Sequence, residues 1–203
     1  LGTGWSIGED KAVANTTGST NGLLQTSTIT SGKIYKATFE VLDYQSGSVR
    51  INLGGAGLTG VGNLVSANGV YTQYITSDGV DVYMQGRVGF IGSITNISVK
   101  EVGQNWDFTN VGGSNGWRIA NERAICDTDG VNNGRNINSS AALVNGKTYK
   151  LTLDILQSVD GMNVIIGGTT LPNELPTGTN LGYEYYIDAS QHSGGLFSIY
   201  GGT

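Results

Sequence analysis

Four polar or aromatic residues in the first half of the sequence have the chemistry of a sugar-binding surface. Arg50 and Asn52 lie two residues apart in SVRINL, and Tyr83 and Gln85 lie two residues apart in DVYMQG. Alternate residues of a strand share one face, so each pair is expected to project outward from its strand. An aromatic ring packs against sugar C–H groups, while amide and guanidinium groups fix the sugar's orientation. If the two strands are neighbours, the four residues form a candidate glycan-binding surface.

Residues suited to catalysis are few. His192 is the only histidine, and its surroundings, SQHSGG, are typical of a solvated loop rather than of a general base. No P-loop or HExxH motif occurs in the sequence. Glu40 and Asp154 occupy equivalent positions in two similar segments, and the outward face of an ordinary strand accounts for both carboxylates. We therefore predict that the protein is not an enzyme and has no catalytic residues.

Metal and redox chemistry have little support either. Cys126 is the only cysteine, so no internal disulfide can form, and we expect a small buried residue rather than a reactive thiol. Four acidic residues are candidate partial ligands for calcium: Glu9, Asp10, Asp127 and Asp129. Their spacing is not that of an EF-hand loop. We predict no metal site and no cofactor, with a structural calcium ion as the less favoured alternative.

Composition indicates a β-protein and excludes several partners. The 203 residues include 33 glycines but only 2 prolines, and 13% of residues are charged, which suits short strands joined by tight turns. The net charge of −5 provides no basic stripe for phosphates, so neither nucleic acid nor an anionic membrane is an expected partner. No apolar run reaches the roughly 20 residues of a transmembrane helix.

The sequence repeats itself, which indicates two similar building blocks. GWSIGEDKAV at 4–13 matches GWRIANERAI at 116–125, and SGKIYKATFEVLDYQSG at 31–47 matches NGKTYKLTLDILQSVDG at 145–161. We expect Trp5 and Trp117 to pack in or beside a core rather than to serve as sugar-stacking platforms.

The repeat places a boundary near Gly103, with one module over 1–103 and a second over 104–203. NWDF at 105–108 precedes only the second Gly-Trp, and FIGSITNISVKEV at 90–102 has no counterpart before Thr203. We therefore expect each module to lack one strand at a chain end.

Period-two alternation assigns strands and their inward faces in both modules. The inward residues of the first are Tyr35, Ala37, Phe39, Val41, Val49, Ile51, Leu53, Val82 and Met84. Those of the second are Tyr149, Leu151, Leu153, Ile155, Met162, Val164, Ile166, Phe197 and Ile199. The fold class predicted from this pattern is all-β, with two tandem antiparallel β-sandwich domains.

The outward positions differ between the modules. The second module has Asn163, Ile165, Ser198 and Tyr200 where the first has the candidate sugar-binding residues. The core pattern therefore repeats, whereas the candidate site does not.

Two pairs of tyrosines, in contrast, repeat. Tyr71 and Tyr74 match Tyr183 and Tyr186. Their spacing of three residues places the two on opposite faces of a regular strand, so we expect a loop entering a strand. Three roles remain open for them: covering the sandwich edge, contacting a neighbouring chain or stacking on sugars.

The order of these motifs resembles the tandem β-sandwich modules of bacteriophage virion proteins, which share the jelly-roll shape of carbohydrate-binding modules. The shared features are the W-x-F and GW-x-I opening, G-K-x-Y-K before a long strand, Gly-Gly after the next strand, and the closing F-x-G-S-I-x-N-I-S-V-K-E-V. Carbohydrate-binding modules commonly have D-N-I in that strand, with the aspartate helping to hold calcium. Here the residues are Thr95, Asn96 and Ile97, and threonine lacks the anionic oxygen that calcium favours.

The resemblance covers nearly the whole chain. It implies a structural part of a tail fibre, head fibre, spike or capsid decoration on the virion exterior. The implied partners are other virion proteins or further copies of the chain, a homotrimer among them, and a host-surface glycan. The alternative is a carbohydrate-binding module or adhesin domain of a secreted or cell-surface bacterial protein.

Overall fold

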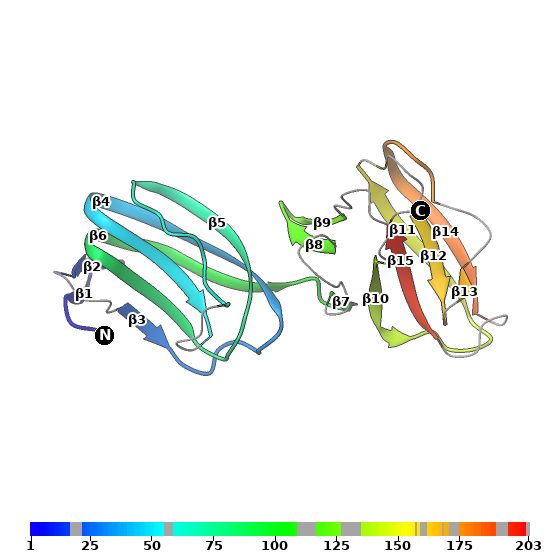
Figure 1. Ribbon diagram of the computed structural model, residues 1–203, viewed down its shortest axis with the longest axis horizontal. Helices are drawn as coiled ribbons and strands as arrows, with labels where there is room; N and C mark the ends of the chain where they lie inside the picture. Colours follow the sequence, from blue (N-terminus) through cyan, green and yellow to red (C-terminus); the bar gives the residue numbers. More distant parts are fainter. Residues whose placement is uncertain are drawn as a thin grey trace. The chain divides into compact units, whose positions relative to one another are not determined.

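The computed structural model describes residues 1–16, 22–54, 59–108, 117–126, 135–156, 158, 162–167, 169–170, 175–189 and 195–201 (Figure 1). Their paired strands are all antiparallel, which confirms the predicted all-β fold. Backbone contacts divide the chain into two compact units, Leu1–Val102 (unit 1) and Gly103–Thr203 (unit 2), which we describe separately.

Unit 1 consists of one antiparallel sheet that folds over itself. Its strands are β1 (Trp5–Gly8), β2 (Lys11–Asn15), β3 (Gly22–Gln25), β4 (Ile34–Leu53), β5 (Gly69–Thr76) and β6 (Val82–Val102). The strand order is β1-β2-β6-β4-β5, and β3 also pairs with β6. The first half of β4 lies between β5 and the end of β6, while its second half pairs with the start of β6, which also carries β3.

The two long strands, β4 and β6, are continuous where the sequence predicts separate strands (Figure 1). The strand register shifts between Leu42 and Ser48. Within this bulge Gly47 has φ +72°, and a Cβ there would lie 2.5 Å from the backbone nitrogen of Phe90. A bulge bends a strand without ending it. Both halves of β4 therefore supply residues, such as Phe39 and Ile51, to one core.

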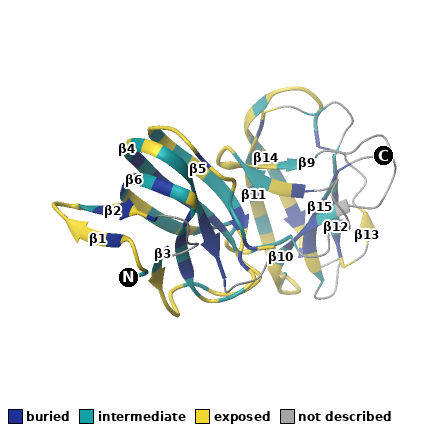
Figure 2. Ribbon diagram, turned by 60° about the vertical axis from the view of Figure 1, so that its left-hand side comes forward, coloured by how far each residue is buried: buried dark blue, intermediate teal, exposed yellow. Residues whose placement is uncertain are grey.

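The predicted inward residues of unit 1 form that core. The fully enclosed side chains are Ala37, Phe39, Val41, Val49, Ile51, Leu53 and Phe90. Figure 2 shows buried positions along the middle of the strands and exposed positions at their turns. Trp5 is 7% exposed and its ring lies 6.1 Å from that of Phe90, which confirms its predicted packing role.

Unit 2 has the same kinds of element in shorter pieces. Its strands are β7 (Trp106–Asp107), β8 (Trp117–Ala120), β9 (Arg123–Cys126), β10 (Arg135–Ala142), β11 (Thr148–Ile155), β12 (Met162–Ile166), β13 (Thr169–Thr170), β14 (Asn180–Asp188) and β15 (Leu196–Gly201). One sheet has the order β13-β12-β15-β10-β7, and β11-β14 and β8-β9 form two further pairs. The core contains Trp117, Ile137, Ile155, Val164, Ile166, Leu175, Ile187, Phe197 and Ile199.

The repeated Gly-Trp phrase folds as the same hairpin in both units. In β1–β2 the two turn residues, Glu9 and Asp10, have φ of 38° and 58°. In β8–β9 the turn residues are Asn121 and Glu122, with φ of 51° and 64°. Two positive φ values in a two-residue loop characterise the type I′ turn, whose twist matches that of the strands.

The residue opposite the tryptophan also repeats in place. Trp5 pairs with Ala14, and Trp117 pairs with Cys126. Ala14 is buried, whereas Cys126 is only partly buried, so the prediction of a buried cysteine was wrong in degree. The larger cysteine side chain reaches toward the backbone of Gly201, where an added Cβ would lie 2.7 Å from the Cys126 Sγ.

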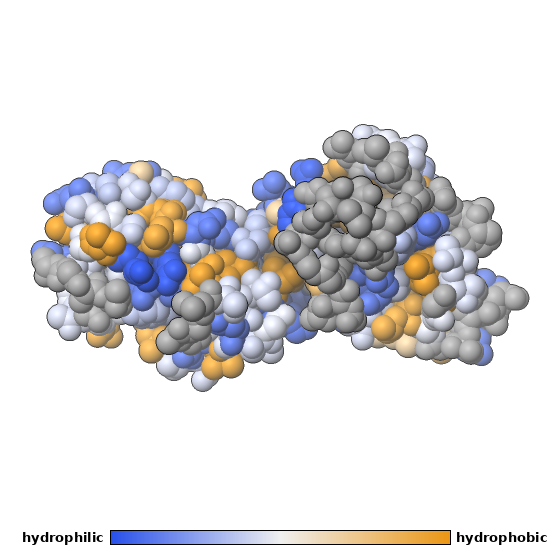
Figure 3. All heavy atoms as spheres, viewed as in Figure 1, coloured by the Kyte–Doolittle hydropathy of each residue, from blue (hydrophilic) through white to orange (hydrophobic). Residues whose placement is uncertain are grey.

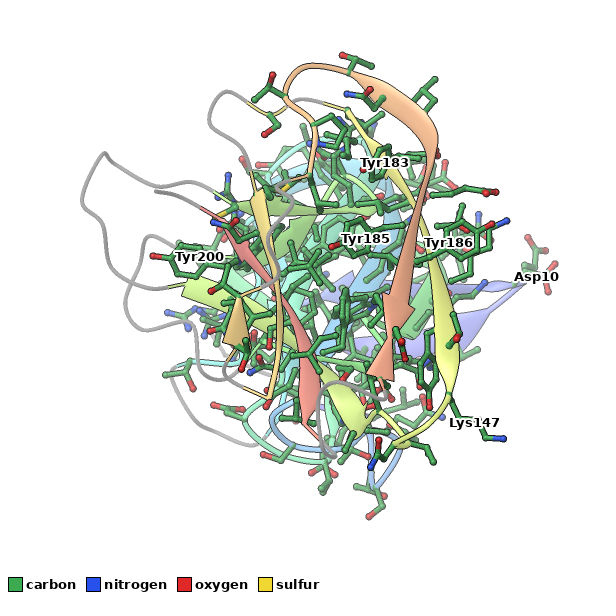
Figure 4. The ribbon with its side chains drawn as sticks, turned by 90° about the vertical axis from the view of Figure 1, so that its right-hand side faces the viewer. Asp10, Lys147, Tyr183, Tyr185, Tyr186 and Tyr200 are labelled. Atoms are coloured by element: carbon green, nitrogen blue, oxygen red, sulfur yellow. The ribbon has the colours of Figure 1, made fainter. Side chains whose placement is uncertain are left out.

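The expectation that the paired tyrosines lie at a loop entering a strand is wrong. Tyr71 and Tyr74 both lie inside β5, and their counterparts both lie inside β14. The Tyr71 ring lies 5.6 Å from that of Phe39, on the core side, while Tyr74 is paired with Lys36. A regular strand therefore puts one tyrosine of each pair inward and the other outward. Figure 4 shows the same division at Tyr185 and Tyr186.

Candidate functional site

The structure brings the four candidate sugar-binding residues of unit 1 together. Arg50 is paired with Gln85, and Asn52 with Tyr83, on the adjacent strands β4 and β6. Their neighbour Ile51 is fully enclosed on the core side. Since alternate residues point to opposite faces, the four lie on the outer face of the sheet.

Gln85 is the centre of this cluster. Its Oε1 accepts hydrogen bonds from Arg50 Nε at 3.0 Å, Asn52 Nδ2 at 3.4 Å and Arg87 Nη1 at 3.5 Å. Arg87 was not among the sequence-predicted residues, although it follows Gln85 by two positions and therefore shares its face. We define the outer-face cluster as Arg50, Asn52, Tyr83, Gln85 and Arg87.

The two guanidinium groups of the cluster have no acidic partner within the described residues. Burial lowers the pKa of Arg50, and the nearby positive charge of Arg87 lowers it further. The segments 17–21 and 55–58, which flank the adjoining strands in the sequence, contain no aspartate or glutamate. The cluster therefore holds two neighbouring positive charges, and the hydrogen-bond acceptor that they share is the neutral side-chain amide of Gln85.

Asn52 is an outward residue that is nonetheless buried. It is 5% exposed, and its Oδ1 has no hydrogen-bond partner among the described residues. The backbone of Val61 pairs with that of Asn52 along the edge of β4 that lies opposite β6. An unpaired buried acceptor costs about 1–3 kcal/mol of stability. This amide is therefore a stability defect of the kind that functional sites retain.

Tyr83 and Leu24 give the outer-face cluster an apolar margin. Burial raises the pKa of the half-buried Tyr83 hydroxyl. On β3, Leu24 is paired with Tyr83 and is 56% exposed. A Cβ on Gly22 would lie 1.9 Å from the Met84 carbonyl oxygen and 2.8 Å from the Tyr83 ring, so glycine lets β3 approach β6 closely beside this ring. Figure 3 shows strongly hydrophilic and hydrophobic areas side by side on the face of unit 1 in view.

Unit 2 has a different arrangement at the equivalent place. Asn163 is paired with Tyr200, and Ile165 with Ser198, on β12 and β15. On the other side of β15, Asn138 Oδ1 accepts hydrogen bonds from Ser198 Oγ at 2.6 Å and from Asn136 Nδ2 at 2.8 Å. Figure 4 shows Tyr200 directed away from its sheet. The buried polar groups here hydrogen-bond to one another.

Of the four candidate calcium ligands, only Glu9 and Asp10 lie within the described residues. Thr95 donates a hydrogen bond from Oγ1 to the backbone oxygen of Asp10 at 2.9 Å. Across the described ranges, no group of three or more His, Cys, Asp or Glu side chains has the geometry to hold a metal ion. Asp127, Asp129 and His192 lie outside these ranges.

No protein-family model, curated protein or solved structure matches the chain. Within the part of the chain that the structure describes, no helix has the length and apolar character needed to cross a membrane.

Proposed function

We propose that the chain is a non-enzymatic structural module of a bacteriophage virion appendage, a fibre, spike or capsid decoration, in which unit 1 attaches to a host-surface glycan. The outer-face cluster is the observation that carries the attachment role. Its amides, guanidinium groups and tyrosine ring match the groups that bind sugars on β-sheet faces. The virion location follows from the resemblance of the sequence motifs.

The form of the two units supports a structural role. Each unit has its own apolar core and is built from antiparallel strands joined by tight turns. Such modules present a surface while the strands hold it rigid. The Gly-Trp hairpin is the same in both units, whereas the polar residues on the outer face differ. A repeated scaffold with one specialised face fits an appendage that contacts a host.

A glycan array of bacterial surface polysaccharides tests the attachment role with the whole chain. We expect saturable binding that falls at least about ten-fold in Tyr83→Ala, because the ring supplies the apolar platform. The matched control is Tyr186→Ala, since Tyr186 is 63% exposed on the outer side of β14 in unit 2. Tyr83→Phe, which keeps the ring, should bind like the parent. Absence of binding to every polysaccharide would overturn the attachment role.

The alternative, a carbohydrate-binding module or adhesin of a secreted or cell-surface bacterial protein, uses the same cluster. Immunogold labelling with an antibody to this chain separates the two settings. Gold particles on intact virions support the appendage, whereas gold on the bacterial surface alone supports the alternative.

A further inference from the structure

We infer that the ligand of unit 1 is an acidic saccharide, and that Arg50 and Arg87 together bind its anionic group. This inference rests on the proposed attachment role and specifies the class of glycan. It follows from the charges, hydrogen bonds and surroundings of the outer-face cluster.

The placement of the arginines is the first argument. Arg50 and Arg87 are the only arginines among residues 1–102, and both donate to the same Gln85 oxygen. Two like charges on one amide repel each other, and neither has an acidic partner in the described structure. An anion between or beside them would relieve that repulsion.

The remaining hydrogen-bonding capacity is the second argument. A guanidinium group carries five N–H donors in a planar fork. The described structure shows one hydrogen bond from each arginine, and both end on Gln85. Gln85 therefore orients the two forks and leaves further donors for a ligand. A fork of this kind matches the two oxygens of a carboxylate or the oxygens of a sulfate.

Two other cations of unit 1 lie beside carboxylates, unlike the two arginines. Lys11 pairs with Asp43 at 2.8 Å, and Lys33 lies 3.9 Å from Glu101. The chain as a whole carries a net charge of −5. A polyanion with closely spaced charges, such as nucleic acid, needs a basic stripe and would be repelled. A saccharide with one anionic group per repeating unit fits the pair, and its neutral part fits the adjoining amides and tyrosine ring.

The test compares matched ligands on the whole chain. The probes are acidic bacterial polysaccharides on an array, each printed before and after chemical reduction of its carboxylates, with sulfated polysaccharides printed before and after desulfation. We expect binding to at least one acidic polysaccharide and its loss on removal of the anionic group. The two treatments distinguish a carboxylate ligand from a sulfate ligand.

Variants assign that binding to the arginines. Arg50→Gln and Arg87→Gln should each weaken binding at least about ten-fold, because each removes a charge-assisted hydrogen bond. Arg50→Lys keeps the charge but loses the fork and should fall between Arg50→Gln and the parent. Arg123→Gln, which changes an exposed arginine in unit 2, is the matched control and should bind normally. Melting curves confirm that each variant is folded.

The outcomes separate this inference from the proposed attachment role. Binding to neutral polysaccharides that is unchanged in Arg50→Gln and Arg87→Gln would overturn the acidic ligand and leave attachment intact. Binding to acidic polysaccharides that survives carboxyl reduction and desulfation would also overturn it. If no polysaccharide binds, both proposals fail.

Discussion

The outer faces of the two units differ although the strands beneath them correspond. In unit 2 the buried Asn138 and Ser198 hydrogen-bond to each other, whereas in unit 1 the Oδ1 of buried Asn52 has no partner among the described residues. Where unit 1 has Asn52, unit 2 has Ile165. The buried amide oxygen in unit 2 is therefore hydrogen-bonded within the protein, whereas the one in unit 1 can still accept a hydrogen bond. This difference is the reason that the proposed attachment role is placed in unit 1.

The inner faces also differ, for a topological reason. The first half of β4 lies between β5 and β6, and its Phe39 is fully enclosed. Its counterpart β11 pairs only with β14 among the described strands, and Leu153 is partly buried. The same alternation of apolar residues is therefore fully buried on β4 of unit 1 and only partly buried on β11 of unit 2.

The largest expected effect comes from truncating this inner face. Phe39→Ala should destabilise unit 1 by about 3–5 kcal/mol, because it leaves a cavity in a closed core. Leu153→Ala should cost unit 2 only about 1–2 kcal/mol, since less apolar surface is lost from a half-buried position. Hydrogen exchange measured by mass spectrometry reports the two units separately. Equal losses would contradict the difference in closure between β4 and β11.

The bulge that bends β4 gives the next effect. Gly47→Ala should cost about 2–4 kcal/mol, because positive φ is strained for alanine and the new Cβ would press on the Phe90 backbone. Gly146 in unit 2 has φ +75° with nothing within 4 Å of an added Cβ, so Gly146→Ala isolates the backbone cost. That control should lose about 1 kcal/mol. Urea unfolding of both variants measures the difference, and similar costs would remove the steric argument for the bend.

The third test exchanges a residue that differs between the outer faces of the two units. Asn52→Ile places the unit 2 residue in unit 1, and it should stabilise unit 1 by about 1–3 kcal/mol because an unpaired buried oxygen disappears. The variant should also bind glycan more weakly, since Gln85 loses one of its donors. The reverse change, Ile165→Asn, should destabilise unit 2. Denaturation and array binding measure both effects, and a destabilised Asn52→Ile would show that the amide supports the fold.

Sequence alternation predicted the core faces and the outward direction of Arg50 and Gln85 because both depend on the period of a strand. It did not predict that Asn52 is buried, since that depends on the backbone of Val61 lying beside β4. The continuity of β4 and β6 was also missed, because turn-like glycines such as Gly47 occur in bulges as well as in loops. Arg87 was identifiable from its spacing to Gln85, but the apolar pattern weakens at Val88, which is exposed.

The smallest expected effect concerns two exposed ion pairs, Lys11–Asp43 in unit 1 and Lys150–Glu184 in unit 2. Lys11 lowers the pKa of Asp43, which also accepts a hydrogen bond from Ser93, and Lys150 lowers the pKa of Glu184. A carboxyl group whose pKa is lowered by folding stabilises the protein above its unfolded-state pKa of about 4, and this stabilisation is lost as the pH falls through the lower folded-state pKa.

Asp43→Asn and Glu184→Gln should therefore melt slightly below the parent at pH 7, and the differences should vanish as the pH falls below about 4. High salt should also reduce them, because both pairs are exposed to solvent. Asp43→Asn should have the larger effect, since Asp43 bonds the buried Ser93 in addition to a lysine. Melting curves from pH 3 to pH 7 at two salt concentrations measure both variants. A difference that grows on acidification would contradict the assigned direction of these pKa shifts.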